Sequence, residues 1–124
     1  METRDLFHGA NGDNILAILR QGQLRPNRDG RIFFSERRFD AVLMHGGDLK
    51  RKATFAIKVR VQIPTGASVT RGATAGVADT LIVTSSAPLR AEILELYVRE
   101  PRAASIKTIK GKSEMIKFLE HPAQ

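Results

Sequence analysis

The sequence predicts an α+β fold built on a mostly antiparallel β-sheet, with a few short helices. Three observations favour this class. One long segment alternates apolar and polar residues, as a strand with one buried face does. Several shorter apolar runs lie between glycine, proline and asparagine residues, whereas few segments have helical spacing. A chain in which strands outnumber helices in this way is typical of the α+β class.

Length and composition predict a single domain over residues 1–124. With 124 residues, 42% of them hydrophobic, the chain is large enough for one core and too small for two. We expect residues 4–100 to form the core of the domain and residues 101–124 a basic C-terminal helix or tail. Cysteine is absent, so the chain has no disulfide and no thiolate metal site.

The sequence contains neither a targeting segment nor a membrane segment that we can identify. The first residues lack the apolar core of a signal peptide. No apolar run approaches the roughly 20 residues that a membrane helix needs. We therefore expect a cytoplasmic protein that does not contact a membrane.

The chain begins with an expected strand and an expected helix. Residues 4–8 read as a short buried strand. Three polar residues can cap the helix that follows: Asn11, Asp13 and Asn14. The apolar residues of this helix have helical spacing: Ile15, Leu16, Ile18 and Leu19. The helix should end at Gly22, because glycine readily takes the left-handed conformation that closes a helix.

A second strand and a second helix are expected next. Residues 24–27 lead into a basic loop at 28–30, and residues 32–34 are expected to form a short strand. Residues 36–45 predict a helix whose inner face carries three apolar side chains: Phe39, Val42 and Leu43. The glycine pair at 46–47 should end it.

The second half of the chain contains the clearest strand. Residues 54–63 alternate apolar side chains with lysine, arginine and glutamine, and Pro64 ends the run. Residues 65–78 are rich in Gly, Ala and Thr and read as a long loop with short β-like pieces. Two further strands are expected at 80–84 and at 92–99.

The C-terminal part is polar and rich in lysine. Ser113 can cap a closing helix over residues 114–120. The apolar side of this helix carries four residues: Met115, Ile116, Phe118 and Leu119.

The positive charge is concentrated in one segment of the sequence. The formal net charge is +7, and residues 20–60 contain eleven Arg or Lys against four Asp or Glu, which is the whole excess. A basic segment of this kind favours a polyanionic partner, such as nucleic acid or the pyrophosphate of a nucleotide. A merely solvated basic face is the alternative.

The ends of the first two strands carry the most informative residues. His8 and Gly9 end the first strand, which sets an imidazole beside a bare backbone, and Ser35 follows the second. Such an arrangement suits a flat ligand with amide and hydroxyl groups. The sequence offers no metal site, because the three histidines are scattered and no known metal motif is present.

Four motifs in order resemble the ADP-ribosyltransferase superfamily, and its His-Tyr-Glu branch most closely, which holds the poly(ADP-ribose) polymerases and diphtheria-toxin-like enzymes. They are the strand ending in His8-Gly9, "ILRQGQLRP", "GRIFFSER" and "DTLIVTSSAPLRAEIL". The resemblance covers residues 5 to about 97. It implies the split, mostly antiparallel sheet of that superfamily, with NAD as the substrate.

The resemblance also implies roles for individual residues. In the family, the histidine that matches His8 hydrogen-bonds a ribose hydroxyl of NAD, and the backbone after it holds the nicotinamide amide, here at Gly9 and Ala10. Phe33 falls at the tyrosine that stacks on the nicotinamide ring, and Ser35 is placed to touch a ribose. A second family aromatic falls at Met44, which keeps only an apolar contact.

The chain departs from the family at the third motif. Thr80 stands where the family has its catalytic glutamate, and threonine supplies no negative charge to a developing oxocarbenium ion. Asp79 is adjacent, but strand alternation directs it to the opposite face. Glu92 and Glu95 lie further along and would serve only in another register. The implied catalytic residues are therefore His8, Phe33 and Thr80.

The resemblance implies an NAD-dependent ADP-ribosyltransferase. The basic segment Arg20–Arg60 favours RNA or DNA, or a protein bound to it, as the acceptor of one ADP-ribose. One alternative is an RNA 2′-phosphotransferase, which has the same fold without the glutamate and relies on arginines, for which this chain offers Arg31, Arg37, Arg38 and Arg71. The other is a degenerate module that binds a nucleotide or nucleic acid without turnover. The sequence does not indicate an oligomeric state.

Overall fold

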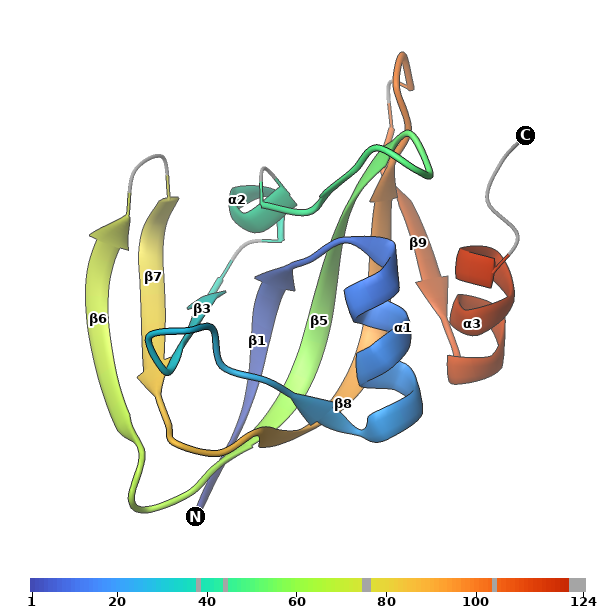
Figure 1. Cartoon of the computed structure of the whole chain (residues 1–124). Coiled ribbons are helices and arrows are strands. Elements are labelled where there is room, and N and C mark those ends of the chain that lie inside the picture. The colour runs from blue at the N-terminus through green and yellow to red at the C-terminus, as the bar shows by residue number, and fades with distance from the viewer. Residues whose placement is uncertain (38, 44, 75–76, 104, 121–124) are drawn as a thin grey trace.

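The computed structural model describes residues 1–37, 39–43, 45–74, 77–103 and 105–120. Within these ranges nine strands form one antiparallel sheet in the order β2-β8-β5-β1-β3-β7-β6, with β4 attached to β5 and β9 to β8 (Figure 1). This confirms the predicted α+β class. The strands are β1 (Glu2–Gly9), β2 (Gln23–Leu24), β3 (Arg31–Ser35), β4 (Gly47–Asp48), β5 (Ala53–Ile63), β6 (Ser68–Thr74), β7 (Val77–Thr84), β8 (Leu89–Arg99) and β9 (Lys107–Lys110).

Three helices accompany the sheet: α1 (Gly12–Gln21), α2 (Asp40–Leu43) and α3 (Lys112–Glu120). Figure 1 shows α1 lying across β5 and β8, with α3 beside it next to β9. Among the residues that the structure describes, no helix is long and apolar enough to cross a membrane.

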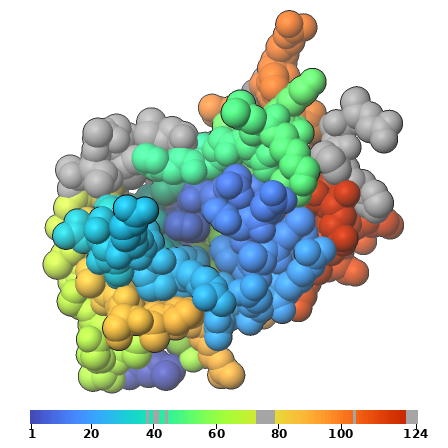
Figure 2. Space-filling view, in the orientation of Figure 1, coloured from blue at the N-terminus to red at the C-terminus, as the bar shows by residue number. Residues whose placement is uncertain are grey.

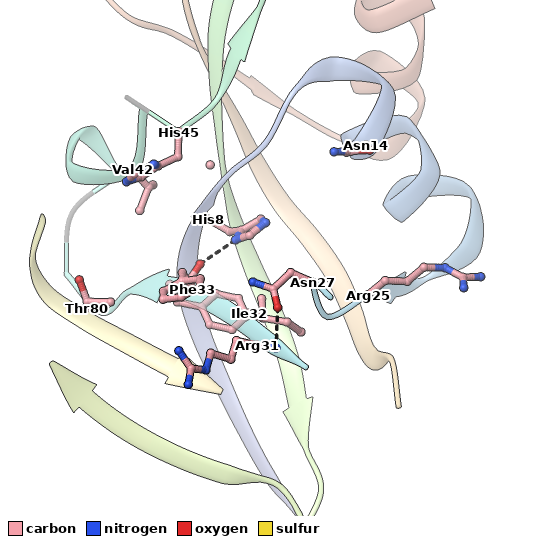
Figure 3. Close-up of a pocket in the computed structure, with 12 residues that line it drawn as sticks. His8, Asn14, Arg25, Asn27, Arg31, Ile32, Phe33, Val42, His45 and Thr80 are labelled. Carbon is pink, nitrogen blue, oxygen red and sulfur yellow. Dashed lines mark hydrogen bonds between the residues drawn. The ribbon is translucent and has the colours of Figure 1, made fainter. Parts of the chain in front are cut away.

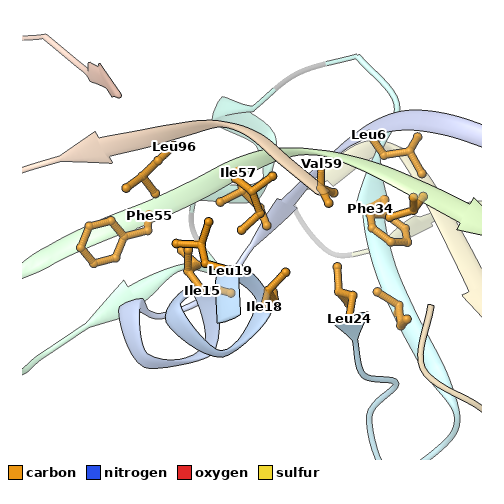
Figure 4. Close-up of a cluster of buried hydrophobic side chains, with 14 of the residues drawn as sticks. Leu6, Ile15, Ile18, Leu19, Leu24, Phe34, Phe55, Ile57, Val59 and Leu96 are labelled. Atoms are coloured by element: carbon orange, nitrogen blue, oxygen red, sulfur yellow. The ribbon is translucent and has the colours of Figure 1, made fainter. Parts of the chain in front are cut away.

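The central strand β5 organises the core, as its alternation predicted. Its apolar side chains at positions 55, 57, 59 and 61 have no exposed surface. They pack against α1 and against Leu6 of β1 and Phe34 of β3 (Figure 4). Each of these side chains removes apolar surface from water, so this one layer of contacts fixes the face of the sheet that α1 covers.

Local signals set both ends of α1 as predicted. The Asn11 side chain accepts a hydrogen bond from the backbone N–H of Asn14 at 2.9 Å, which satisfies a donor that the first helical turn leaves open. Gly22 follows the helix with a φ of 68°, in the left-handed region. The strand β1 therefore leads directly into a helix whose start is fixed.

The sheet is weakly joined between β1 and β3. The ladder between them has a single register pair, Phe7 with Ser35. By contrast, every residue of β1 from Glu2 to Gly9 pairs with β5, and every residue of β3 pairs with β7. Beyond Phe7 the two halves of the sheet diverge, which Figure 1 shows between the blue and cyan strands.

Two predictions of secondary structure were right only in part. Among the described residues of 36–45, only those of α2 are helical. Glu36 stays with the sheet, because its N–H donates to the carbonyl of Asp79 and its carboxylate pairs with Arg71. The loop expected over 65–78 contains β6 and the start of β7, which pair as an edge hairpin. Its threonine and valine side chains suit a strand once β7 is present to pair with.

Other differences concern short elements and ends. The strands expected at 4–8, 80–84 and 92–99 are longer, and three short strands were not predicted: β2, β4 and β9. Helix α3 begins at Lys112, before the predicted cap at Ser113, and its first backbone hydrogen bond runs from Met115 to the carbonyl of Gly111.

Candidate functional site

A cavity of about 530 Å³ opens where β1 and β3 diverge. Figure 2 shows the hollow on the molecular surface between the loop before β3 and α1, and Figure 3 shows its lining. The residues around it are His8, Gly9, Asn14, Arg25, Asn27, Arg31, Ile32, Phe33, Phe34, Val42, His45 and Thr80. Its volume lies within the range of about 300 to 1,000 Å³ that is usual for small-molecule sites.

The His8 side chain spans the gap between the two halves of the sheet. Its Nδ1 lies 2.8 Å from the backbone carbonyl oxygen of Phe33 (Figure 3). Because a carbonyl only accepts, Nδ1 carries the proton and donates it, which leaves Nε2 as an acceptor in the neutral ring. Here a side-chain hydrogen bond takes the place of strand pairing, and the ring presents an acceptor at Nε2.

Burial keeps the His8 ring neutral. Loss of water around the ring lowers the pKa of His8 below its usual value of 6.5, and the nearby His45 lowers it further. The bond to the Phe33 carbonyl acts in the opposite direction but is outweighed. At neutral pH the Nε2 atom therefore remains an acceptor.

Consecutive phenylalanines of β3 have different surroundings. Phe34 is 1% exposed and packs in the main core, with its ring centroid 5.5 Å from that of His8. Phe33 points the other way, is partly exposed and lines the cavity. Because successive residues of a strand face opposite sides, a cavity that touches both of them must wrap around the edge of β3.

Gly9 is required for the close approach of α2. A Cβ atom at this position would stand 2.0 Å from the carbonyl oxygen of Val42, far inside van der Waals contact. The glycine thus allows the backbone of α2 to close over the end of β1. Gly9 in the sequence motif His8-Gly9 therefore has a structural role, in addition to the contact with a ligand that the sequence predicts.

Replacing Gly9 with alanine is expected to lower the unfolding free energy by about 1 to 3 kcal/mol, because α2 must move away from β1. Gly66→Ala is the matched control, since a Cβ there meets nothing within 4 Å. Thermal unfolding of the two variants checks this. Equal melting temperatures for both variants would contradict the close contact.

The loop before β3 is held by Asn27. Its side-chain oxygen accepts hydrogen bonds from the N–H groups of Asp29 and Arg31 at 2.9 and 3.0 Å. Gly30 closes the turn with a φ of 76°. This turn sets the start of β3 and holds Arg25 and Arg31 at the cavity. Neither arginine forms an ion pair with any residue that the structure describes.

A second, more polar chamber of about 360 Å³ adjoins the cavity. The two share His8, Gly9, Asn14, Arg25 and His45. The chamber continues along α1 past Ala10 to Gln21. An elongated ligand could therefore occupy both spaces, with His8 and Gly9 at the point where they meet.

The structure brings together most of the residues that the sequence singled out. His8, Gly9, Phe33 and Thr80 line the cavity, and Ala10 lines the adjoining chamber. Ser35 is 1% exposed at the junction of β1 and β3 and is not among the lining residues. Met44 lies outside the described residues.

Three carboxylates were considered as substitutes for the glutamate that the resemblance implies, and none of them lines the cavity. Asp79 is exposed, with a φ of 60°. Glu92 is exposed on β8, and Glu95 accepts a hydrogen bond from the Tyr97 hydroxyl on the same strand. Among the lining residues that the structure describes, no Asp or Glu is present.

The basic segment is not one continuous patch. Arg20 pairs with Glu120, Arg60 pairs with Asp5, and Arg51 is buried against Asp48. Arg25 and Arg31 remain at the cavity. The sequence analysis missed Asn14, Asn27 and His45 as lining residues; a weak signal for the Asn27 turn was the asparagine followed three residues later by glycine.

Comparisons with known proteins yield no match to this chain among protein-family models, curated proteins or solved structures. The case for a function therefore comes from the geometry of the cavity and from the motifs of the sequence.

Proposed function

We propose that the protein is an NAD-dependent ADP-ribosyltransferase that attaches one ADP-ribose to a nucleic acid or to an acceptor bound to it. The observation that carries the proposal is the neutral His8 ring at the junction of the two half-sheets. Its Nδ1 is held by the Phe33 carbonyl at 2.8 Å, so its Nε2 can accept a hydrogen bond from a ribose hydroxyl.

The surroundings of His8 support NAD as the ligand. The single register pair between β1 and β3 fits the split sheet that the resemblance implies. Beside His8, the Gly9 backbone and the Phe33 ring border the same cavity, which suits a flat aromatic amide such as nicotinamide. Arg25 and Arg31 add positive charge for phosphate groups.

Transfer of ADP-ribose requires stabilisation of a positive charge on the ribose, and this chain offers little negative charge for it. The bond between nicotinamide and the ribose C1″ breaks, nicotinamide leaves, and an acceptor oxygen or nitrogen bonds to C1″ as it loses its proton. Positive charge develops on the ribose before the new bond forms. Thr80 lines the cavity where the resemblance places a glutamate, and its hydroxyl carries no negative charge to stabilise that state. We therefore expect slow turnover.

Incubation of the purified protein with labelled NAD tests the proposal. We expect slow release of nicotinamide, and label on RNA or DNA when either is added. Thr80 is only 1% exposed, so thermal unfolding first checks that Thr80→Glu and Thr80→Gln are folded. The folded Thr80→Glu should raise the rate by about tenfold or more, because it adds a carboxylate at the cavity, whereas the uncharged Thr80→Gln should not. If neither the native protein nor Thr80→Glu releases nicotinamide or labels any acceptor, the proposal fails.

The second candidate is an RNA 2′-phosphotransferase. One observation favours it: the described lining contains Arg25 and Arg31 and lacks a carboxylate. Of the arginines that the sequence suggested for this activity, only Arg31 lines the cavity; Arg71 pairs with Glu36, Arg37 lies outside the lining, and Arg38 falls outside the described residues. Removal of a 2′-phosphate from RNA in the presence of NAD would favour this activity over the first.

A further inference from the structure

A groove separate from the cavity lies between two tips at the same end of the sheet. One tip is the turn from β4 to β5, residues 47–54, and the other follows β8, residues 99–103. In Figure 1 they are the green turn and the orange loop above β8, and Figure 2 shows both projecting from the surface. The groove has a volume of about 720 Å³.

The groove carries more positive than negative side chains. Lys52, Arg99 and Arg102 line it, all three exposed, and none is in an ion pair with a described residue. Its acids are Glu100, which is exposed, and Asp48, which is bound to Arg51. The groove is therefore positive, and it combines residues from inside and outside the basic segment of the sequence.

Two of these cations stand on unusual backbone. Lys52 has a φ of 54° and Arg102 a φ of 67°, and only Asp79 joins them as a described non-glycine residue with a positive φ. Such conformations are costly for residues with a Cβ and tend to occur at functional sites. Both strained turns direct a basic residue into the same groove.

The lining of the groove also includes apolar residues. Leu49 is 97% exposed, and Ala53, Pro101 and Ala103 also line the groove. Proteins bind a single nucleic-acid strand by placing cations near its phosphates and by stacking its bases on aromatic rings or on arginine guanidinium planes, and this groove offers the cations and two arginines. An acidic peptide would use the charges but has no bases to stack on the guanidinium groups.

The groove also lies next to the candidate site. Gly47 lines both the groove and the polar chamber beside His8, and that chamber shares five residues with the cavity. We propose that this groove, through Lys52, Arg99 and Arg102, binds the backbone of a single-stranded nucleic acid that leads toward the cavity. This proposal rests on the proposed function in one respect: both take a nucleic acid as the acceptor of ADP-ribose.

Salt-dependent binding of a short labelled single-stranded RNA, with a DNA of the same sequence and a polyglutamate peptide in parallel, tests the groove. The groove variant is Lys52→Asn, Arg99→Gln and Arg102→Asn, since asparagine tolerates a positive φ. The control variant removes the same charge elsewhere through Arg90→Gln, Lys112→Gln and Lys117→Gln, three exposed cations outside the groove.

We expect the groove variant to bind the strand about tenfold more weakly, and its log–log slope against salt to fall by about 2, or roughly 0.7 for each lost phosphate contact. The control variant should keep most of the affinity and slope. Equal losses in both variants, or tighter binding of polyglutamate than of either strand, would overturn the proposal. The affinities for RNA and for DNA of the same sequence show which sugar the groove prefers.

Nicotinamide release from NAD without nucleic acid separates the two proposals. The groove variant is expected to release it at the native rate, since its three changes lie outside the cavity. If the groove variant binds the nucleic acid more weakly but the native protein does not turn over NAD, the proposed enzyme is refuted and the proposed groove is retained. If NAD is turned over but the groove variant binds the nucleic acid as tightly as the native protein does, the proposed groove is refuted and the proposed enzyme is retained.

Discussion

Arg51→Met is expected to lower the unfolding free energy by about 3 to 5 kcal/mol, because it leaves the buried Asp48 carboxylate without its partner. Arg51 belongs to a run of three basic residues, yet its side chain is only 6% exposed. A melting temperature lower by roughly 10 to 20 °C would correspond to this loss.

The effect follows from what the guanidinium joins. Its Nε donates to the backbone carbonyl of Leu119 at the end of α3, and its two terminal nitrogens donate to Asp48 and Asp13, each at 2.9 Å. Asp48 in turn accepts from the N–H of Gly12 at 2.7 Å. One buried side chain therefore holds the start of α1, the strand β4 and the end of α3 together.

Arg60→Met is the matched control. Arg60 also pairs with an aspartate, Asp5, in a two-bond contact, but half of its side chain is exposed. Exposed pairs contribute little because water screens them, so this variant should melt close to the native protein. Similar melting temperatures for the Arg51 and Arg60 variants would show that the buried network does not hold the helices.

Acid should weaken the same network. Burial by itself would raise the pKa of Asp48, but hydrogen bonds from the Arg51 and Gly12 backbones and from the Arg51 side chain outweigh it and lower the pKa below 3.8. A carboxyl with a lowered pKa stabilises the fold above its ordinary pKa, and that contribution is lost as the pH falls through the folded value. The Arg51 variant should lose less stability than the native protein over this acidic range.

The sequence predicted the elements whose signals are local. The alternation of residues 54–63 identified β5, and the asparagine and glycine around α1 identified its ends. The elements that it missed depend on partners far along the chain. The two residues of β4 have no periodicity of their own, and they form a strand only because β5 lies beside them.

The candidate site divides in the same way. The motifs brought His8, Phe33 and Thr80 to one place, and the structure has all three around the cavity. Asn27 carries no motif, and its role in the turn depends on the backbone N–H groups it meets. From the sequence, Arg51 looks solvent-exposed, since it lies in a run of basic residues. Its burial could not be predicted, because its carboxylate and carbonyl partners come from α1, β4 and α3.

His8→Asn is expected to separate the structural contribution of His8 from the proposed contact of its Nε2 atom with NAD. An asparagine amide can donate to the Phe33 carbonyl from a place close to that of Nδ1, but it has nothing at the position of Nε2. The fold should therefore keep most of its stability, while NAD affinity falls by about tenfold, the equivalent of one lost hydrogen bond. Equilibrium binding of NAD, with thermal unfolding of the same samples, measures both.

His8→Ala completes the comparison. It removes both hydrogen-bonding edges of the ring, so the Phe33 carbonyl loses its donor at a cost of about 1 to 3 kcal/mol. We expect the alanine variant to lose both stability and NAD affinity. If His8→Asn binds NAD as tightly as the native protein, Nε2 does not contact the ligand, and His8 serves only to join the half-sheets.

The pH dependence of stability gives an independent check on the state of His8. Burial lowers its folded pKa below the usual 6.5, so the unfolded chain binds the proton more readily than the native protein does. The stability that the neutral ring contributes is complete above pH 6.5 and is lost as the pH falls through the folded pKa. Melting temperatures of the native protein should thus decline on acidification from that pH more steeply than those of His8→Asn, in which His45 and all carboxylates are retained. Parallel curves for the two proteins would mean that folding does not lower the pKa of His8. Nε2 would then gain a proton, and cease to be an acceptor, at a higher pH than a ring with a lowered pKa would.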